Sequence, residues 1–263
     1  MNTADQSPAR FLGVSLKMYF DYEQTLAWAA QIAAVVAADR DKLRDVELVI
    51  FPTFPSLAAV AKIFANTPVA LGAQNLSDHE QGAYTGEVSA PTLAQVGCSY
   101  VEIGHAERRL LFGEGDAEIQ GKLTAAFRNR LTPLLCVGEP TQGSNVAAGE
   151  YCLRQLANTL GRIGEEYRGQ PVVVAYEPIW AIGAQSPATV EHIATVCQVV
   201  KQWLAQNRPL AKSCVVYGGS AGSGLLAQLG TRVDGLFLGR FAHDSQAFAE
   251  ILAEAIRQPF GNG

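Results

Sequence analysis

Three residues with reactive side chains each follow a strand-like apolar run, at widely separated points of the chain: Lys17, His105 and Glu177. A carboxylate can act as a general base, an imidazole can polarise a carbonyl, and an ammonium supplies a fixed positive charge. If these side chains converge, they can transfer a proton between neighbouring atoms of a small molecule. Each alone has an ordinary structural interpretation: a surface lysine, a buried histidine, and a carboxylate in a cap or ion pair.

Two glycine-containing turns predict a second kind of site. The turn from Gly218 to Ser220 follows the apolar run at 213–217, and Gly239 follows another such run. Backbone N–H groups in turns and at helix N-termini bind phosphate without needing many cationic side chains. The sequence therefore predicts a phosphate beside the proton-transfer residues, although the same glycines could serve only to make tight turns.

Short apolar runs and longer amphipathic stretches alternate along the chain and must position these residues. The runs do not alternate with polar residues, which is typical of strands that are buried on both faces in a parallel sheet. The predicted strands cover 11–15, 46–51, 69–73, 100–103, 132–137, 172–176, 213–217 and 235–238. Apolar periodicity near 3.6 residues predicts helices over 23–38, 55–64, 90–96, 118–130, 147–167, 189–205, 222–229 and 245–257.

Eight strands that are each followed by a helical stretch fit a closed (β/α)₈ barrel in a chain of 263 residues. An open doubly wound sheet usually carries G-x-G-x-x-G after its first strand, and neither this fingerprint nor a Walker A motif occurs. Because no linker divides the chain, we expect one α/β domain over 1–263, with a flexible tail over 1–10. Active sites of barrels lie at the C-terminal ends of the strands, where the residues above fall.

The composition is that of a mildly acidic globular protein. Twenty basic and 25 acidic residues give a net charge of −5, and the absence of a basic cluster argues against a nucleic-acid partner. The five cysteines lack C-x-x-C spacing, so neither a disulfide framework nor a cysteine-based zinc site is expected. There is no stretch of ~20 apolar residues and no apolar secretory signal. We therefore expect a cytoplasmic protein with no membrane contact.

The motifs around these residues resemble those of the triosephosphate isomerase family, in the family's order and from about residue 11 to 256. The matching segments are K-M at 17–18, A-Q-N at 73–75, G-A-Y-T-G-E-V-S at 82–89, G-H-A-E-R-R at 104–109, C-V-G-E at 136–139, A-Y-E-P-I-W-A-I-G at 175–183, Y-G-G-S at 217–220 and D-G-L-F-L-G at 234–239. The resemblance implies a TIM barrel and an aldose-ketose isomerase. It favours dihydroxyacetone phosphate and glyceraldehyde 3-phosphate as the substrates.

The resemblance also implies catalytic roles. Glu177 would be the base that moves a proton between adjacent substrate carbons. Neutral His105 would polarise the carbonyl and pass protons between the oxygens. Lys17 would stabilise the enediolate and the phosphate charge, with Glu107 as its supporting neighbour. From the residues alone, Glu107 fits equally well in a structural ion-pair network with the two arginines that follow it.

A phosphate site and a lid are implied in the same way. Residues 178–188 would form the lid, and an enediol phosphate that is exposed to water can lose its phosphate, so closure has a physical purpose. Backbone N–H groups of Gly183, Ser220 and Gly239 would hold the phosphate. Tyr217 and Ser220 would latch the closed lid.

The expected partners are a small phosphorylated sugar and a second copy of the chain. The loop at 76–87, with Thr85 at its tip, would insert into the neighbouring subunit of a homodimer. No metal and no organic cofactor are implied, because a base and an electrophile suffice for this proton transfer.

Three departures from the family pattern concern the residues around the substrate. Ser15 stands where the family usually has asparagine, which leaves room for a water or a larger substrate. The lid reads Ala184-Gln185-Ser186 after its glycine, where T-G-K is usual, and Arg240 replaces the second glycine of the last phosphate turn. The alternative substrate is therefore a four-carbon ketose phosphate such as an erythrulose phosphate.

Two further classes of function fit parts of the sequence. Gly218 to Gly222 reads G-x-S-x-G, the nucleophile elbow of serine hydrolases, with Asp234 and His243 following in a suitable order. Against a hydrolase, few residues remain after Ser220 to form the usual strands. A non-catalytic sugar-phosphate sensor is the other class, and the intact lysine, histidine and glutamate argue against it.

Overall fold

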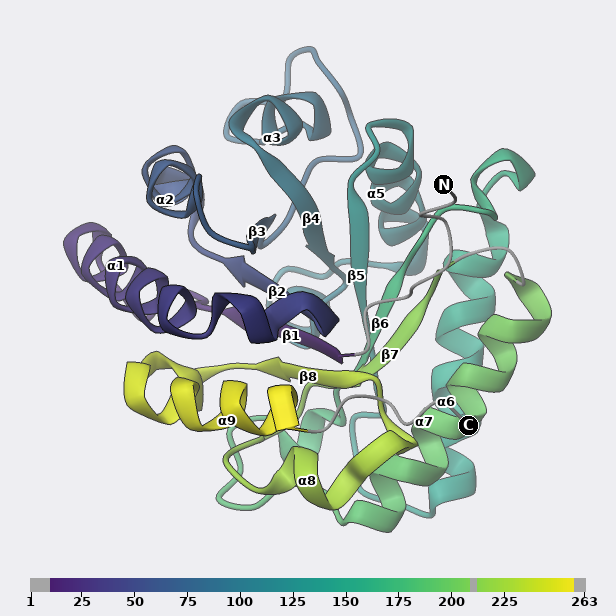
Figure 1. Cartoon of the computed structure of the whole chain (residues 1–263). Helices are drawn as coiled ribbons and strands as arrows, with labels where there is room; N and C mark the ends of the chain where they lie inside the picture. Colours follow the sequence, from purple (N-terminus) through teal and green to yellow (C-terminus); the bar gives the residue numbers. More distant parts are fainter. Residues whose placement is uncertain (1–9, 209–211, 258–263) are drawn as a thin grey trace, which may run out of the picture.

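Eight parallel strands close into a barrel within residues 10–208 and 212–257, which the computed structural model describes (Figure 1). Each strand pairs with the next in sequence, and β8 pairs with β1. The strands are β1 Arg10–Ser15, β2 Val46–Phe51, β3 Val69–Ala73, β4 Cys98–Ile103, β5 Thr132–Val137, β6 Val173–Tyr176, β7 Cys214–Tyr217 and β8 Gly235–Leu238. The predicted (β/α)₈ barrel is confirmed, with strand ends that differ from the predicted ones by two residues at most.

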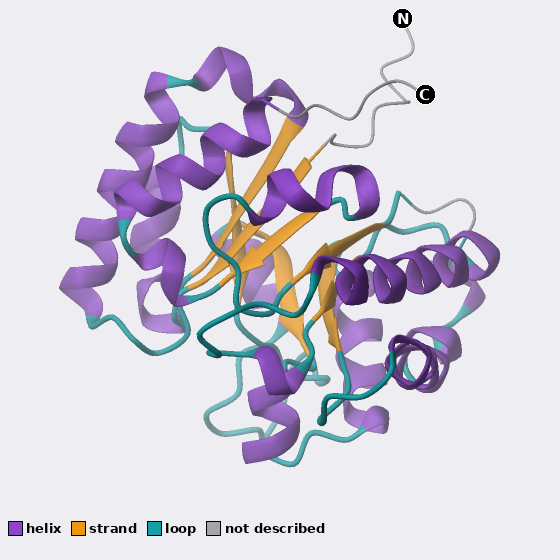
Figure 2. Cartoon of the chain, turned by 90° about the horizontal axis from the view of Figure 1, so that it is seen from below, coloured by secondary structure: helices purple, strands orange, loops and turns teal. Residues whose placement is uncertain are grey.

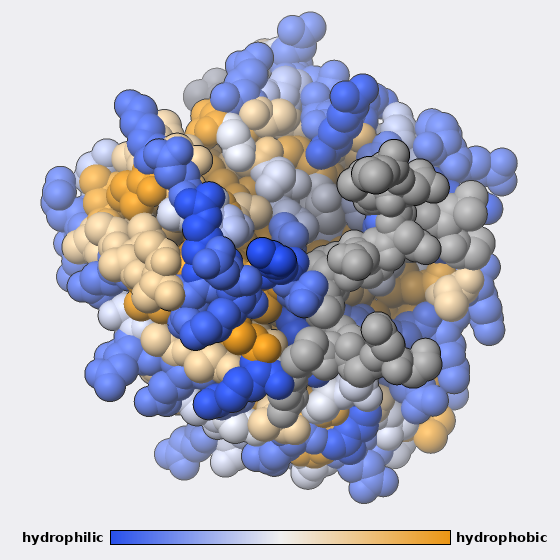
Figure 3. Space-filling view, viewed as in Figure 1, coloured by the Kyte–Doolittle hydropathy of each residue, from blue (hydrophilic) through white to orange (hydrophobic). Residues whose placement is uncertain are grey.

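The helices form a layer around the outside of the strands (Figure 2). They are α1 Tyr22–Ala38, α2 Leu57–Phe64, α3 Ala90–Val96, α4 Ala106–Leu111, α5 Asp116–Arg128, α6 Asn145–Asn158, α7 Val190–Asn207, α8 Leu225–Leu229 and α9 Ser245–Arg257. Helix α4 was not predicted, because its six residues are too few to show a period. On the face seen in Figure 3, hydrophilic residues lie around the outer edge of the molecule, as expected for helices that bury only one side against the core.

The prediction of one helix over 147–167 is wrong. Helix α6 ends at Asn158, and Thr159 leaves the helical region with φ −113° and ψ −83°. Two 3₁₀ turns follow, at Leu160–Arg162 and Glu165–Tyr167. Gly161 and Gly164 lie just beyond the break, and glycine disfavours a helix interior by about 1 kcal/mol relative to alanine.

The predicted tail over 1–10 needs a correction at its last residue. Arg10 is the first residue of β1 and is 1% exposed. Its Nη1 donates hydrogen bonds to the carbonyl oxygens of Gly230 (2.8 Å) and Val233 (3.0 Å), which lie just before β8. The rest of the predicted tail, residues 1–9, lies outside the described residues.

Alternate residues of each strand point into the barrel, and the others pack under the helices. Phe11 and Ala175 belong to the interior cluster, whereas Leu12 belongs to the helix-facing cluster. Both faces are therefore apolar, which explains why the strands show no polar alternation. Counting in steps of two from Phe11 and Ala175 places Ser15 and Glu177 on the interior side at the C-terminal mouth.

The interior is packed closely enough to require glycine at one position of β3. A Cβ atom on Gly72 would lie 2.3 Å from Cε1 of Phe51.

We expect Gly72→Ala to reduce the free energy of unfolding by about 1–3 kcal/mol, because the added methyl group overpacks the core and forces neighbouring side chains to move. Urea denaturation measures the change. Gly143→Ala is the matched control, because nothing lies within 4 Å of its Cβ position, and it should change stability by less than ~0.5 kcal/mol. Equal stability of both variants would contradict this packing.

Candidate active site

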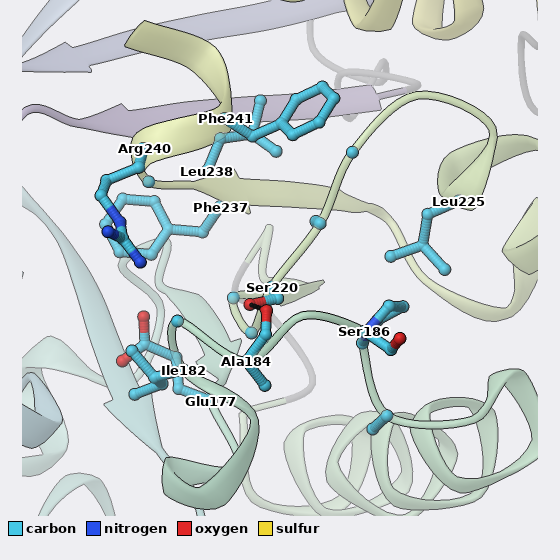
Figure 4. Close-up of a pocket in the computed structure, with 18 of the residues that line it drawn as sticks. Glu177, Ile182, Ala184, Ser186, Ser220, Leu225, Phe237, Leu238, Arg240 and Phe241 are labelled. Atoms are coloured by element: carbon cyan, nitrogen blue, oxygen red, sulfur yellow. Dashed lines mark hydrogen bonds between the residues drawn. The ribbon is translucent and has the colours of Figure 1, made fainter.

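A cavity of about 1150 Å³ opens at the C-terminal ends of the strands (Figure 4). It contains every residue that the sequence placed in the site: Ser15, Lys17, His105, Glu107, Glu177, Gly183, Ser220, Gly239 and Arg240. These residues come from the ends of β1, β4, β6, β7 and β8 and from the segment after β6. The barrel therefore brings together side chains that are far apart in sequence.

Lys17 lies just after β1 in an unusual backbone conformation. Its φ of +49° is in the left-handed region, which costs a non-glycine residue about 1–3 kcal/mol. The Gln74 side chain secures this turn, because Nε2 donates to the carbonyl oxygens of Lys17 (3.0 Å) and Phe51 (2.9 Å). The Lys17 ammonium lies 2.6 Å from Oε1 of Glu107. Burial alone would lower the pKa of Lys17, but Glu107 and the more distant Glu177 raise it above its ordinary value.

His105 is the N-cap of α4, and this position determines which ring nitrogen carries the proton. Nδ1 accepts a hydrogen bond from the backbone N–H of Glu107 at 3.2 Å. The neutral ring therefore carries its proton on Nε2, which lies 3.5 Å from Oε2 of Glu177. Burial, assisted by the positive charge of Lys17, lowers the pKa of His105 to about 4. At neutral pH, His105 is thus an uncharged donor that faces the cavity.

Glu177 follows β6 and is 3% exposed. Burial, together with the negative charge of Glu102, raises its pKa to about 8, while Lys17 acts in the opposite direction. Its Oε2 has no hydrogen-bond partner among the described residues. A buried carboxylate with a free oxygen and a raised pKa is a stronger base than an exposed one.

Two glycines allow Glu177 to occupy this place. A Cβ atom on Gly138 would lie 2.0 Å from the carbonyl oxygen of Glu177. A Cβ atom on Gly218 would lie 2.6 Å from its Cγ. The glycines of C-V-G-E and Y-G-G-S therefore leave space for the backbone and the side chain of Glu177, respectively.

The segment at 178–188 covers one side of the cavity and contacts the residues that were predicted to latch it. The Ser220 hydroxyl donates to the carbonyl oxygen of Ala184 at 2.9 Å. The Tyr217 hydroxyl accepts from the backbone N–H of Ala188 at 3.1 Å. The Trp180 indole donates to Oε1 of Glu139 at 2.7 Å. The segment is thus tied to the barrel at both of its ends.

The end of the cavity predicted to hold phosphate contains Gly183, Ser220, Gly239 and Arg240. The Ser220 N–H already donates to the carbonyl oxygen of Ala181 at 3.1 Å, so a phosphate must share this donor or displace Ala181. Arg240 points into the cavity (Figure 4), with Nη2 3.4 Å from the Cβ position of Gly183. The guanidinium of Arg240, which was predicted to bind the substrate, therefore lies beside Gly183, whose backbone amide was predicted to hold the phosphate.

Glu102 is a further buried carboxyl group at this site that the motifs did not single out. It lies on β4, is 3% exposed, and accepts a hydrogen bond from the Ser15 hydroxyl at 3.0 Å. Burial raises its pKa to about 8. A signal was present in the sequence, because a glutamate inside a predicted strand of a parallel sheet is unusual.

The serine hydrolase alternative is contradicted by the geometry. Asp234 precedes β8 at the opposite end of the barrel from Ser220, and its carboxylate contacts Lys201 (2.6 Å) and the backbone N–H of Val215 (2.7 Å). His243 contacts the carbonyl oxygen of Ser15. The three residues of the supposed triad therefore do not meet.

The described residues contain neither a grouped set of metal ligands nor a membrane-spanning helix. Within residues 10–208 and 212–257, no three or more His, Cys, Asp or Glu side chains are grouped so that they could hold a metal ion. In the same ranges, no helix is both long and apolar enough to cross a membrane.

Comparison with known proteins agrees with this architecture. The sequence profile of the triosephosphate isomerase family matches residues 10–255. A solved structure of triosephosphate isomerase from Bartonella henselae superposes with a TM-score of 0.79 at 27% identity, over 95% of this chain and 99% of that one.

Two kinds of curated relatives are similar over most of their length. The L-erythrulose-1-phosphate isomerase of Pectobacterium atrosepticum is 50% identical over 93% of this chain and 95% of its own, and the enzyme of that name from Rhizobium etli is 36% identical over 92% and 91%. The triosephosphate isomerase of Chloroflexus aurantiacus is 36% identical over 90% and 95%.

The protonation state of His105 can be measured directly. In ¹⁵N NMR spectra we expect a neutral ring protonated on Nε2 that titrates only near pH 4. The Lys17→Met variant should raise this midpoint, because the lysine charge lowers the pKa of His105. A wild-type midpoint near the ordinary ~6.5 would contradict the described environment.

Proposed function

The chain belongs to the triosephosphate isomerase family, and we propose that it isomerises a four-carbon ketose phosphate, erythrulose 1-phosphate, by proton transfer through an enediolate. The main support for this type of reaction is that Lys17, His105 and Glu177 line the same cavity. The motifs alone favour a triose phosphate. Ser15 and the 50% identity to an enzyme named for L-erythrulose 1-phosphate support the longer sugar.

Glu177 starts the reaction as the base. It takes the proton from the hydroxyl-bearing carbon next to the ketone, and the electrons of that C–H bond form the C=C bond of an enediolate. Glu177 then returns a proton to the former carbonyl carbon. Moving the ketone from C2 to C3 converts erythrulose 1-phosphate into erythrulose 4-phosphate, so no atom is gained or lost.

His105 and Lys17 stabilise the charge that develops on the oxygens. Nε2–H of His105 donates to the carbonyl oxygen as it becomes negative, and a neutral imidazole can also pass the proton between the two oxygens. The Lys17 ammonium is already in place beside the cavity, held 2.6 Å from Glu107. Both donors are therefore oriented before the substrate binds, which avoids a reorganisation cost in the transition state.

The phosphate and the lid complete the proposed mechanism. Amides of Gly183, Ser220 and Gly239 bind the phosphate, and Arg240 adds a positive charge beside them. When the segment at 178–188 closes, it excludes water from the enediolate and so prevents loss of the phosphate. The hydrogen bonds from the lid to Ser220 and Tyr217 support this role.

Glyceraldehyde 3-phosphate and dihydroxyacetone phosphate are the second candidate substrate pair. The same proton transfer serves both sugars, and the 36% identical Chloroflexus aurantiacus relative is named triosephosphate isomerase. The difference between the candidates is one hydroxymethyl group on the carbon that loses its proton.

Steady-state kinetics distinguish these substrates. We expect kcat/KM for erythrulose 1-phosphate to exceed that for glyceraldehyde 3-phosphate by at least ~10-fold. Glu177→Gln should lower turnover by at least ~10²-fold, because the amide cannot accept the proton. This loss would show that the activity does not come from a contaminating isomerase. Triose turnover near ~10⁸ M⁻¹s⁻¹ with weaker tetrulose turnover would instead establish the second candidate.

We also propose that the protein is a homodimer through the loop at 76–87. Thr85 is exposed, and the neighbouring Tyr84 stacks on His79 with ring centroids 3.9 Å apart. Leu111 and Phe112, at the end of α4, are exposed apolar side chains that a second copy could cover. Because His105 is the N-cap of α4, such a contact would also restrain the position of His105 in the site.

Sedimentation velocity tests the dimer. We expect Thr85→Arg to shift the wild-type dimer toward monomer, because a charge buried without a partner at an interface is unfavourable. The matched control is Thr195→Arg on α7, which should leave the dimer intact. A monomeric wild-type protein, or an unchanged dimer in Thr85→Arg, would contradict the proposed interface.

A further inference from the structure

Glu102 is a buried acid that the proton-transfer mechanism does not use. It occupies the interior side of β4, together with Ser15 and Glu177 at the mouth, and the rest of the barrel interior is filled by an apolar cluster: Phe11, Val49, Phe51, Leu134, Cys136, Val173, Ala175, Val216 and Phe237. A carboxyl group in such a setting is unfavourable unless it is paired or hydrogen-bonded. The unfavourable position of Glu102 is therefore a reason to look for a function of this residue.

The partners of Glu102 satisfy only part of its capacity. Oε2 accepts the Ser15 hydroxyl at 3.0 Å, while Oε1 lies 4.0 Å from Nε2 of His105. Among the described residues, His105 is the only basic side chain within ion-pair distance of Glu102, and at neutral pH it is uncharged. A carboxyl group has up to four lone-pair positions, so Oε1 can still bind a hydroxyl group.

Glu102 does not itself line the cavity, but the two residues nearest to its carboxyl oxygens, Ser15 and His105, both do. His105 Nε2 is 3.5 Å from Glu177 Oε2 and 4.0 Å from Glu102 Oε1. The reacting carbons must lie within reach of both His105 and Glu177. A group attached to the carbon that loses its proton can therefore extend past Ser15, which lines the cavity, toward the Glu102 carboxyl group that Ser15 contacts.

We propose that Ser15 and Glu102 form a subsite for the terminal hydroxymethyl group of a four-carbon sugar phosphate. The short serine leaves the space, and Glu102 forms a hydrogen bond with the terminal hydroxyl. The inference rests on the proposed function, because of the candidate substrates only the tetrulose carries a hydroxymethyl group on the carbon that loses its proton. A site built to bond a substrate hydroxyl rejects the analogue that lacks it, since a buried polar group is then left without its partner.

The variants Glu102→Val and Glu102→Gln test this subsite. Valine is the residue at interior positions such as Val49, Val173 and Val216, so it suits the barrel, and glutamine keeps the shape and a hydrogen-bonding amide. We expect Glu102→Val to lower kcat/KM for erythrulose 1-phosphate by ~10–100-fold, mainly through KM, with a clearly smaller loss for glyceraldehyde 3-phosphate. Glu102→Gln should lie between the wild type and the valine variant.

Glu47→Gln is the matched control. Like Glu102, Glu47 is a carboxyl group on a barrel strand that accepts a hydrogen bond, here from Tyr100 at 3.1 Å, but it is only half-buried and lies at the start of β2, away from the mouth. It should leave the ratio of the two kcat/KM values unchanged. Thermal melting of all three variants establishes that each is folded.

The outcomes separate this inference from the proposed function. A wild type that prefers the triose overturns the proposed function and the subsite together. A wild type that prefers the tetrulose, with equal losses for both substrates in Glu102→Val and Glu102→Gln, overturns the subsite alone and assigns Glu102 a purely structural role. If only Glu102→Gln folds, an unchanged ratio of the two kcat/KM values in that variant also overturns the subsite.

Discussion

The positive charge of Lys17 stabilises the ionised forms of three neighbouring carboxyl groups at the mouth of the barrel: Glu102, Glu107 and Glu177. Its ammonium lies 2.6 Å from Glu107. Burial raises the pKa of both Glu177 and Glu102 to about 8, and Lys17 acts against this rise in each case. The same charge helps to keep His105 neutral. One cation therefore influences the base, the electrophile and the proposed subsite, and the left-handed turn that presents it is secured by Gln74.

The barrel supplies the positions that this interaction requires. The two-residue alternation of the strands directs Ser15 and Glu102 inward, and the short α4 fixes the tautomer of His105 through the N–H of Glu107. Which sugar the site accepts then depends on a few side chains at the mouth of the barrel. A change at Ser15 or Glu102 can alter which sugar fits while the proton-transfer residues stay the same, which is how one fold serves several substrates.

Much of this arrangement could be predicted from the sequence. Apolar runs located all eight strands, and the ordered motifs located the residues that line the cavity. The helix break after Asn158 was missed because the periodic pattern continues through the glycines that interrupt it. Glu102 was missed because it belongs to no motif used, and its importance depends on contacts with Ser15 and His105 from other parts of the chain. Such contacts become visible only when the strands are assembled.

The most direct test of the electrostatic account is to measure the protonation of the two buried carboxyl groups. Infrared difference spectra of the protein, recorded as pH is raised, report the C=O band of a protonated carboxyl group. We expect this band at neutral pH, its loss as pH rises through about 8, and a smaller band in the Glu177→Gln variant. Complete ionisation of both groups near the ordinary pKa of ~4.3 would contradict the claim that burial raises the pKa of Glu177 and so makes its ionised form a stronger base.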